Sequence, residues 1–211
     1  GDMLGWFRDI VAWPIDNLSS VSVTDREKLN DEIITALSLQ AEKLPISESA
    51  PLALDWINGR RTPDANQALK TAIINLSLGT NAPAIFRALI EAICFGSRKI
   101  VDRFKEEGVE IKSVVGVGGV AKKSPFIMQT LADVLNMPIK VASSDQAPAL
   151  GAAMYAATAA GLYGSVTQAS KAMSNGFEKI YQPNAKNVSV YTKMYKTYCQ
   201  LGDYIEGSIN H

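Results

Sequence analysis

The sequence predicts a helix-rich α/β domain. Long stretches carry apolar residues at helical spacing, and two short apolar runs are separated by enough chain for the helical crossover that parallel strands need. The chain has 211 residues, a length that buries a sizeable core. It contains no recognisable linker, low-complexity tract or internal repeat. We therefore expect residues 1–211 to form one domain.

Two long helices are predicted in the first half. Thr24 and Glu27 have the spacing of a capping box, and we expect the first helix to run from there to about Lys43. The second starts near Asn81 and ends at Gly108. The apolar faces of the two helices comprise Leu29, Ile33, Ile34 and Leu37 in the first and Ile85, Leu89, Ile93, Ile100 and Phe104 in the second.

Charged pairs mark the face of the second helix that we expect to be exposed. Arg87 and Glu91 lie four residues apart, as do Arg98 and Asp102. Such pairs are typical of a solvated helix surface. Between the two helices, residues 52–66 predict a short strand followed by an Asn-Gly turn and a proline-containing loop.

The second half predicts a small parallel sheet. Residues 113–117 form a continuous apolar run, typical of a strand buried on both faces. A helix over 124–135 and a short strand over 139–141 follow, which is the order of a parallel crossover. The chain ends with a helix near 184–204, whose apolar face comprises Val188, Tyr191, Tyr195, Tyr198 and Leu201.

The stretch 146–170 carries no charge. It is rich in Ala, Gly, Ser and Thr and lacks the Leu, Ile and Phe content that drives membrane insertion. Ser143 and Gln146 have capping-box spacing, so we expect a helix that opens there and ends at Gly161. Its small side chains predict a buried helix that packs closely against a neighbour.

Composition excludes several classes of function. Lys+Arg and Asp+Glu are equal at 21 each, so no basic surface for nucleic acid or anionic membrane is indicated. The only histidine is His211, which rules out histidine-based triads and metal sites. No phosphate-binding P-loop motif is present. Cys94 and Cys199 do not make a disulfide framework, so we expect a cytoplasmic protein.

The segment 115–124 is the main candidate for ligand binding. A predicted strand ends in Gly116, Gly118 and Gly119, and a loop with Lys122 and Lys123 then opens a helix. Ligands of α/β sheets bind beyond the carboxyl ends of strands, where glycines permit close approach and helix N-termini attract phosphate. A plain strand-to-helix turn with two solvated lysines explains the same residues equally well.

Residues 118–161 resemble the signature of the FGGY carbohydrate kinases. The matching positions are Gly118, Gly119, Gln129, Ala132, Asp133, Pro138, Asp145, Gly151, Ala152 and Ala153. Residues 59–63 resemble a Gly-Glu-Arg-x-Pro loop of the family, with Arg60 in place of Glu, and residues 1–9 resemble a segment that lines the nucleotide. The segments 54–67 and 122–139 most resemble members that phosphorylate L-ribulose.

This resemblance implies an actin-like, ribonuclease H-like ATPase domain. It implies that ATP and Mg²⁺ bind in a cleft between two domains that close on a small sugar. The catalytic aspartate, the sugar pocket, a phosphate loop and the first strands of this domain are then expected upstream. We expect this chain to be the C-terminal, nucleotide-binding part of a longer enzyme, to be inactive alone and to have no catalytic or metal-binding residue of its own.

The resemblance also implies roles for individual residues. Gly118 and Gly119 would lie against the adenosine, and Lys123 would contact the base or ribose. Gly1 and Gly5 map to the nucleotide side. For Gln129, Asp133 and Asp145 we favour caps or buried polar contacts over ligand binding.

Two other functions are consistent with the sequence. The enzyme could phosphorylate another pentulose or related sugar, because the sugar-reading residues lie mostly upstream. The chain could also be a non-catalytic, actin-like nucleotide-binding or interaction module. Its oligomeric state, including a homo-oligomer, is open.

Overall fold

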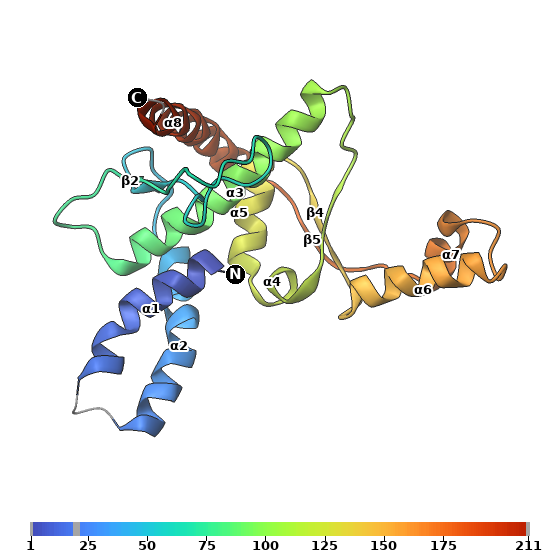
Figure 1. Ribbon diagram of the computed structural model, residues 1–211, viewed down its shortest axis with the longest axis horizontal. Helices are drawn as coiled ribbons and strands as arrows, with labels where there is room; N and C mark the ends of the chain where they lie inside the picture. Colours follow the sequence, from blue (N-terminus) through green and yellow to red (C-terminus); the bar gives the residue numbers. More distant parts are fainter. Residues whose placement is uncertain (1, 19–21, 210–211) are drawn as a thin grey trace.

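The computed structural model describes residues 2–18 and 22–209. These residues form helices and short strands in an order that alternates between the two types in the second half of the chain (Figure 1). The elements are α1 (Asp2–Asn17), α2 (Val23–Glu42), β1 (Leu52–Ala53), β2 (Ile73–Ile74), α3 (Ala82–Glu106), β3 (Val114–Gly116), α4 (Gly118–Lys123), α5 (Pro125–Leu135), β4 (Ile139–Ala142), α6 (Ala147–Ala159), α7 (Val166–Met173), β5 (Phe177–Tyr181) and α8 (Ala185–Ile209).

The strands form two small sheets. β1 and β2 pair antiparallel, with Leu52 opposite Ile74. The other sheet has the order β3-β4-β5, and β3 runs parallel to β4 with Val114 opposite Ile139. β5 is antiparallel to β4. The predicted parallel crossover is confirmed, whereas α1, β2, α4, α7 and β5 were not expected from the sequence.

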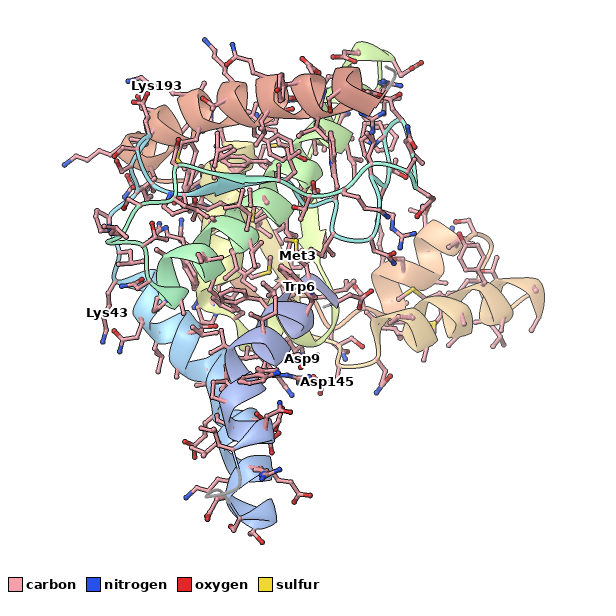
Figure 2. All side chains as sticks on the ribbon, turned by 60° about the vertical axis from the view of Figure 1, so that its left-hand side comes forward. Met3, Trp6, Asp9, Lys43, Asp145 and Lys193 are labelled. Carbon is pink, nitrogen blue, oxygen red and sulfur yellow. The ribbon has the colours of Figure 1, made fainter. Side chains whose placement is uncertain are left out.

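Helix α3 lies at the centre of the body, with α1, α2, α5 and β1 packed against it (Figure 1). It begins after Asn81, whose side chain accepts a hydrogen bond from the backbone N of Ala84 at 3.0 Å. It ends before Gly108, which has a φ of 79°. Both predicted ends are therefore confirmed. In Figure 2, α8 lies across the top of this body with Lys193 at its surface, and α1 and α2 extend away below.

Two predicted helix starts are displaced. Helix α2 is capped by Ser22, whose side chain accepts from the backbone N of Asp25 at 3.2 Å, and Thr24 lies inside the helix. Helix α6 follows Gln146, and that residue makes no side-chain cap. The predicted capping boxes at Thr24 and Ser143 are therefore wrong: another short polar residue, Ser22, caps α2, and α6 has no side-chain cap.

The Arg87–Glu91 pair is buried, contrary to prediction. The two residues are 6% and 2% exposed. Arg87 Nε donates to Glu91 Oε1 at 2.8 Å and Nη1 donates to the carbonyl of Ala41 at 2.9 Å. The end of α2 and Tyr191 of α8 pack over this face of α3, which the spacing of charges alone does not reveal. Arg98 and Asp102 are half-buried, and Arg98 Nε lies 3.8 Å from Asp102 Oδ2.

Helices α6 and α7 project away from the body as an arm (Figure 1). They pack on each other, and α6 has no buried residue. The predicted burial of this charge-free segment is wrong. Small side chains permit a close neighbour, but within the described chain only α7 is packed against α6.

Strand β3 also differs from its prediction. Val115 and Val117 are exposed, although we expected burial on both faces. The strand forms the edge of its sheet, and none of the described elements covers that face. Within residues 2–18 and 22–209, no helix combines the length and the apolar character needed to cross a membrane.

Candidate functional site

The glycine pair sits at the junction between strand β3 and the short helix α4. Val117 precedes the helix and makes no side-chain cap, so the first N–H groups of α4 have no side-chain acceptor there. Gly118 has a φ of 81°, in the left-handed region that side chains disfavour. Backbone conformation is therefore sufficient reason for a glycine at position 118.

Gly119 has no such reason. Its φ is not in the left-handed region, and a Cβ added to it would meet no atom within 4 Å apart from its chain neighbours and the backbone of its own helix. The space above this residue is open, and it faces a groove. A glycine that neither the backbone nor the packing requires is consistent with a molecule lying against it.

The groove has a volume of about 500 Å³ and runs between the α1–α2 hairpin and the α4–α5 turn. This size is in the range of small-molecule pockets. Its floor and walls are largely apolar, with a few polar groups. The lining includes Leu4 of α1, Ser38 and Glu42 of α2, Gly119 and Lys123 of α4, and Phe126 of α5.

The two lysines of α4 have different surroundings. Lys122 Nζ donates to the carbonyl of Ser143 at 2.7 Å and to Asp145 Oδ1 at 2.5 Å, and it lies 3.4 Å from Glu178 Oε2. The side chain of Lys123 makes no hydrogen bond or ion pair with any described residue. Lys122 therefore ties α4 to the end of the sheet, and Lys123 is left as the cation of the groove.

The ion pair of Lys122 shifts the titration of both groups. The hydrogen bond from Lys122 lowers the pKa of Asp145 below its usual value, and the same bond raises the pKa of Lys122. Both groups are charged at neutral pH. Lys122 consequently remains occupied by protein carboxylates, and the predicted role for a pair of mobile lysines reduces to Lys123.

The structure brings together part of the predicted nucleotide site. Gly119 and Lys123 line the groove, and Gly118 precedes them without lining it. Gly5 is half-exposed on α1 and does not line the groove, but its neighbour Leu4 does. Gly1 lies outside the described residues.

The expected buried polar contacts hold for Asp133 and Gln129, whereas Asp145 is neither a cap nor buried. Asp133 is buried and accepts hydrogen bonds from Gln129 Nε2 at 2.9 Å, from the backbone N of Asn184 at 2.8 Å and from Asn187 Nδ2 at 2.7 Å. Gln129 also donates to the carbonyl of Gln182. Asp145 pairs with Lys122 at the surface.

Sequence reasoning missed the wall that α2 contributes. Thr35, Ser38 and Glu42 recur at intervals of three and four residues and so lie on one face of the helix. That spacing could have grouped them. It could not have shown that they face a groove, because a polar stripe on a helix is usually solvated.

Comparison with known proteins identifies the family. The model of the FGGY family of carbohydrate kinases, C-terminal domain, matches residues 5–160. The chain belongs to this family. Among curated FGGY relatives, Ribulokinase from Vibrio parahaemolyticus is 42% identical over 209 residues, and the match covers 98% of this chain and 37% of that relative. The chain thus spans well under half the length of the relative.

Solved structures share the fold. The ligand-bound xylulose kinase from Lactobacillus acidophilus superposes with a TM-score of 0.79 at 20% identity, over 99% of this chain and 39% of that one. Xylulose kinase from Rhodospirillum rubrum superposes with a TM-score of 0.78 at 19% identity, over 100% of this chain and 39% of that one. The fold of the FGGY chain is accordingly the actin-like ATPase fold, as predicted.

Proposed function

We propose that the intact protein transfers a phosphoryl group from ATP to L-ribulose and that this chain binds the adenosine side of the nucleotide. The choice of sugar is supported by curated relatives named Ribulokinase at 33–42% identity. The xylulose kinase structures, at 17–22% identity, support the fold alone. Cytoplasmic location is part of the same proposal.

The open position above Gly119 carries the proposal. A purine ring is flat and can lie against a backbone without a Cβ, in a groove that Leu4 and Phe126 line with apolar side chains. Lys123, with no protein partner among the described residues, is free to pair with ribose or phosphate oxygens. Gly118 permits the turn that presents both residues.

The contribution of this chain to catalysis is then positioning. Phosphoryl transfer relies mostly on holding the nucleotide in line with the acceptor hydroxyl and on stabilising charge. The proton acceptor is expected upstream. Among the described residues, no group of three Asp, Glu, His or Cys side chains could hold a metal ion. Mg²⁺ at kinase sites is held by substrate phosphates and one or two carboxylates, so any Mg²⁺ of the intact protein would arrive with the phosphates.

Replacement of Gly119 by Val in the intact protein tests the assignment. The β-branched side chain would fill the space above α4, so the KM for ATP should rise at least tenfold while the KM for L-ribulose changes little. Gly207→Val is the matched control, because Gly207 is also a helical glycine with no atom within 4 Å of an added Cβ and is remote in sequence from the groove. Steady-state kinetics, with ATP and L-ribulose varied in turn, give the KM for each substrate in each of the two variants.

Two results would contradict the proposal. A rise in the KM for the sugar alone would mean that the groove belongs to the sugar site. Equal effects of Gly119→Val and Gly207→Val would mean that the groove holds no substrate. A panel of L-ribulose, xylulose and other pentuloses separates the proposed sugar from its runner-up, and the absence of turnover with all of them favours a non-catalytic nucleotide-binding module.

A further inference from the structure

A second cavity lies behind the nucleotide groove. It has a volume of about 330 Å³ and is bounded by the end of α2, by α3, by α5 and by the first turns of α8. Glu42 and Phe126 line both spaces, so the cavity and the groove are neighbours separated by these two side chains. Of the residues assigned above to the nucleotide, Phe126 is shared with the cavity, and Gly119, Lys123 and Leu4 line the groove alone.

The buried polar residues of the described chain converge on this cavity. Four polar or charged residues are buried in the chain as described, namely Arg87, Glu91, Thr130 and Asp133. Three of them line the cavity, and Glu91 is paired with Arg87. Burying polar groups is costly unless they find partners. Arg87 and Asp133 find theirs within the protein, so a lining residue without a partner needs an explanation.

Thr130 is the clearest case. It is 4% exposed, and its hydroxyl has no hydrogen-bond partner among the described residues. Thr158 and Thr192 show the usual solution in a helix, because each donates to the carbonyl four residues earlier. Thr130 makes no such bond. Its hydroxyl remains available to a molecule in the cavity.

Other lining groups also keep unused capacity. Gln129 uses both amide hydrogens on Asp133 and Gln182, which leaves its carbonyl as an acceptor. Asn187 donates one hydrogen to Asp133 and keeps the rest of its amide. The cavity therefore offers both donors and acceptors, the combination that hydroxyl groups satisfy in both directions.

Charge and apolar surface narrow the class of ligand. The positive charge of Arg87 is balanced by Glu91, while Asp133 and Glu42 add two carboxylates to the lining. An anion would therefore be repelled. The ring of Phe126 and the side chain of Ile46 provide an apolar wall suited to the C–H face of a small molecule.

We propose that this cavity binds a neutral polyol of about the size of a pentose, at a site separate from the nucleotide groove. The volume is at the lower end of the range for small-molecule pockets, which fits a ligand of this size. The hydroxyl of Thr130 and the amides of Gln129 and Asn187 bind its hydroxyl groups.

Ribitol is the probe, and saturation-transfer NMR on the intact protein is the measurement. Thr130→Val removes the hydroxyl with little change of shape, and loss of one buried hydrogen bond should weaken ribitol binding about five- to tenfold. Thr35→Val is the matched control. It is the same substitution, and Thr35 lines the groove but not the cavity. The wild type, Thr130→Val and Thr35→Val are each titrated with ribitol. Binding of ribitol at any other site on the protein contributes equally to the three titrations and cancels when they are compared.

Two further measurements keep the proposal falsifiable. Crystals grown with ribitol should show it in the cavity of the wild-type protein even if Thr130→Val fails to fold. Ribitol 5-phosphate, which carries the disfavoured charge, should not displace ribitol from the cavity. Equal ribitol affinity in Thr130→Val and wild type, ordered water alone in the cavity, or preferred binding of the phosphate ester would each overturn the proposal.

Discussion

The α6–α7 arm and the body around α3 distribute charge in opposite ways. In the body, Arg87 and Glu91 are almost fully buried and bonded to α2 and α8. In the arm, a segment with no charged residue is open to solvent, and Tyr155 of α6 is 67% exposed. Burial in this chain is decided by which elements pack together and not by the local content of charge.

The physical reason lies in what each helix contacts. Helix α3 has neighbours on several sides, so even its charged face is covered. The guanidinium of Arg87 is hydrogen-bonded to backbone carbonyls and to the carboxylate of Glu91. Helix α6 contacts α7, and its small side chains bury little area. Mutations that remove interactions should therefore have large effects in the body and small ones in the arm.

The largest effect is expected for Arg87→Met. The change leaves the Glu91 carboxylate buried without its cation, which should lower the free energy of unfolding by about 3–5 kcal/mol. Arg103→Met is the control, because Arg103 pairs with Asp64 at the surface and should leave stability nearly unchanged. Urea denaturation of the two variants and the wild type gives the comparison.

The double variant Arg87→Met/Glu91→Met sharpens this test. Removing both charges avoids the unpaired carboxylate and should recover part of the lost stability. Similar losses in Arg87→Met and Arg103→Met would show that the α3 pair is solvated in solution, and the contrast between body and arm would fail.

A smaller, pH-dependent effect should distinguish Asp55 in the body from Asp145 at the base of the arm. Burial raises the pKa of Asp55, and the hydrogen bond from Tyr198 Oη at 2.6 Å opposes the shift without cancelling it. The folded state thus holds this proton more tightly than the unfolded chain. The contribution of Asp55 to stability should fall as the pH rises above the unfolded value of 3.8.

Asp145 should show the opposite slope. Its pKa is lowered by Lys122, so its contribution is present above the unfolded value of 3.8 and is lost as the pH falls. Unfolding of the wild type, Asp55→Asn and Asp145→Asn across acidic to neutral pH measures both differences. Slopes of the same sign would mean that Asp55 is as hydrated as Asp145.

The smallest effect is expected in the arm itself. Tyr155→Ser should change the free energy of unfolding by no more than roughly 0.5 kcal/mol, as is usual for exposed positions. Tyr191→Phe in the body is the reference, because Tyr191 bonds both Arg87 and Glu91. If Tyr155→Ser cost more than Tyr191→Phe, α6 would be covered in solution.

Local signals in the sequence predicted most element types. The cap at Asn81, the stop at Gly108 and the apolar spacing of α8 each depend on nearby residues alone, and each is confirmed. Strands β2 and β5 were missed because their residues acquire strand geometry only by pairing with β1 and β4. For the site, the sequence predicted Gly119 and Lys123. It did not predict the groove wall that α2 contributes, because the polar face of α2 has the same pattern as that of any solvated helix.

By itself, the sequence determined the helix-rich α/β class, the parallel crossover and the glycine turn, because periodicity, caps and positive φ are properties of neighbouring residues. Only the tertiary structure decided the burial of Arg87 and Glu91, the exposure of α6 and the placing of Glu42 and Phe126 between two cavities. These features depend on contacts between residues distant in the chain. Their energies come from desolvation and packing, which no local pattern of residues encodes.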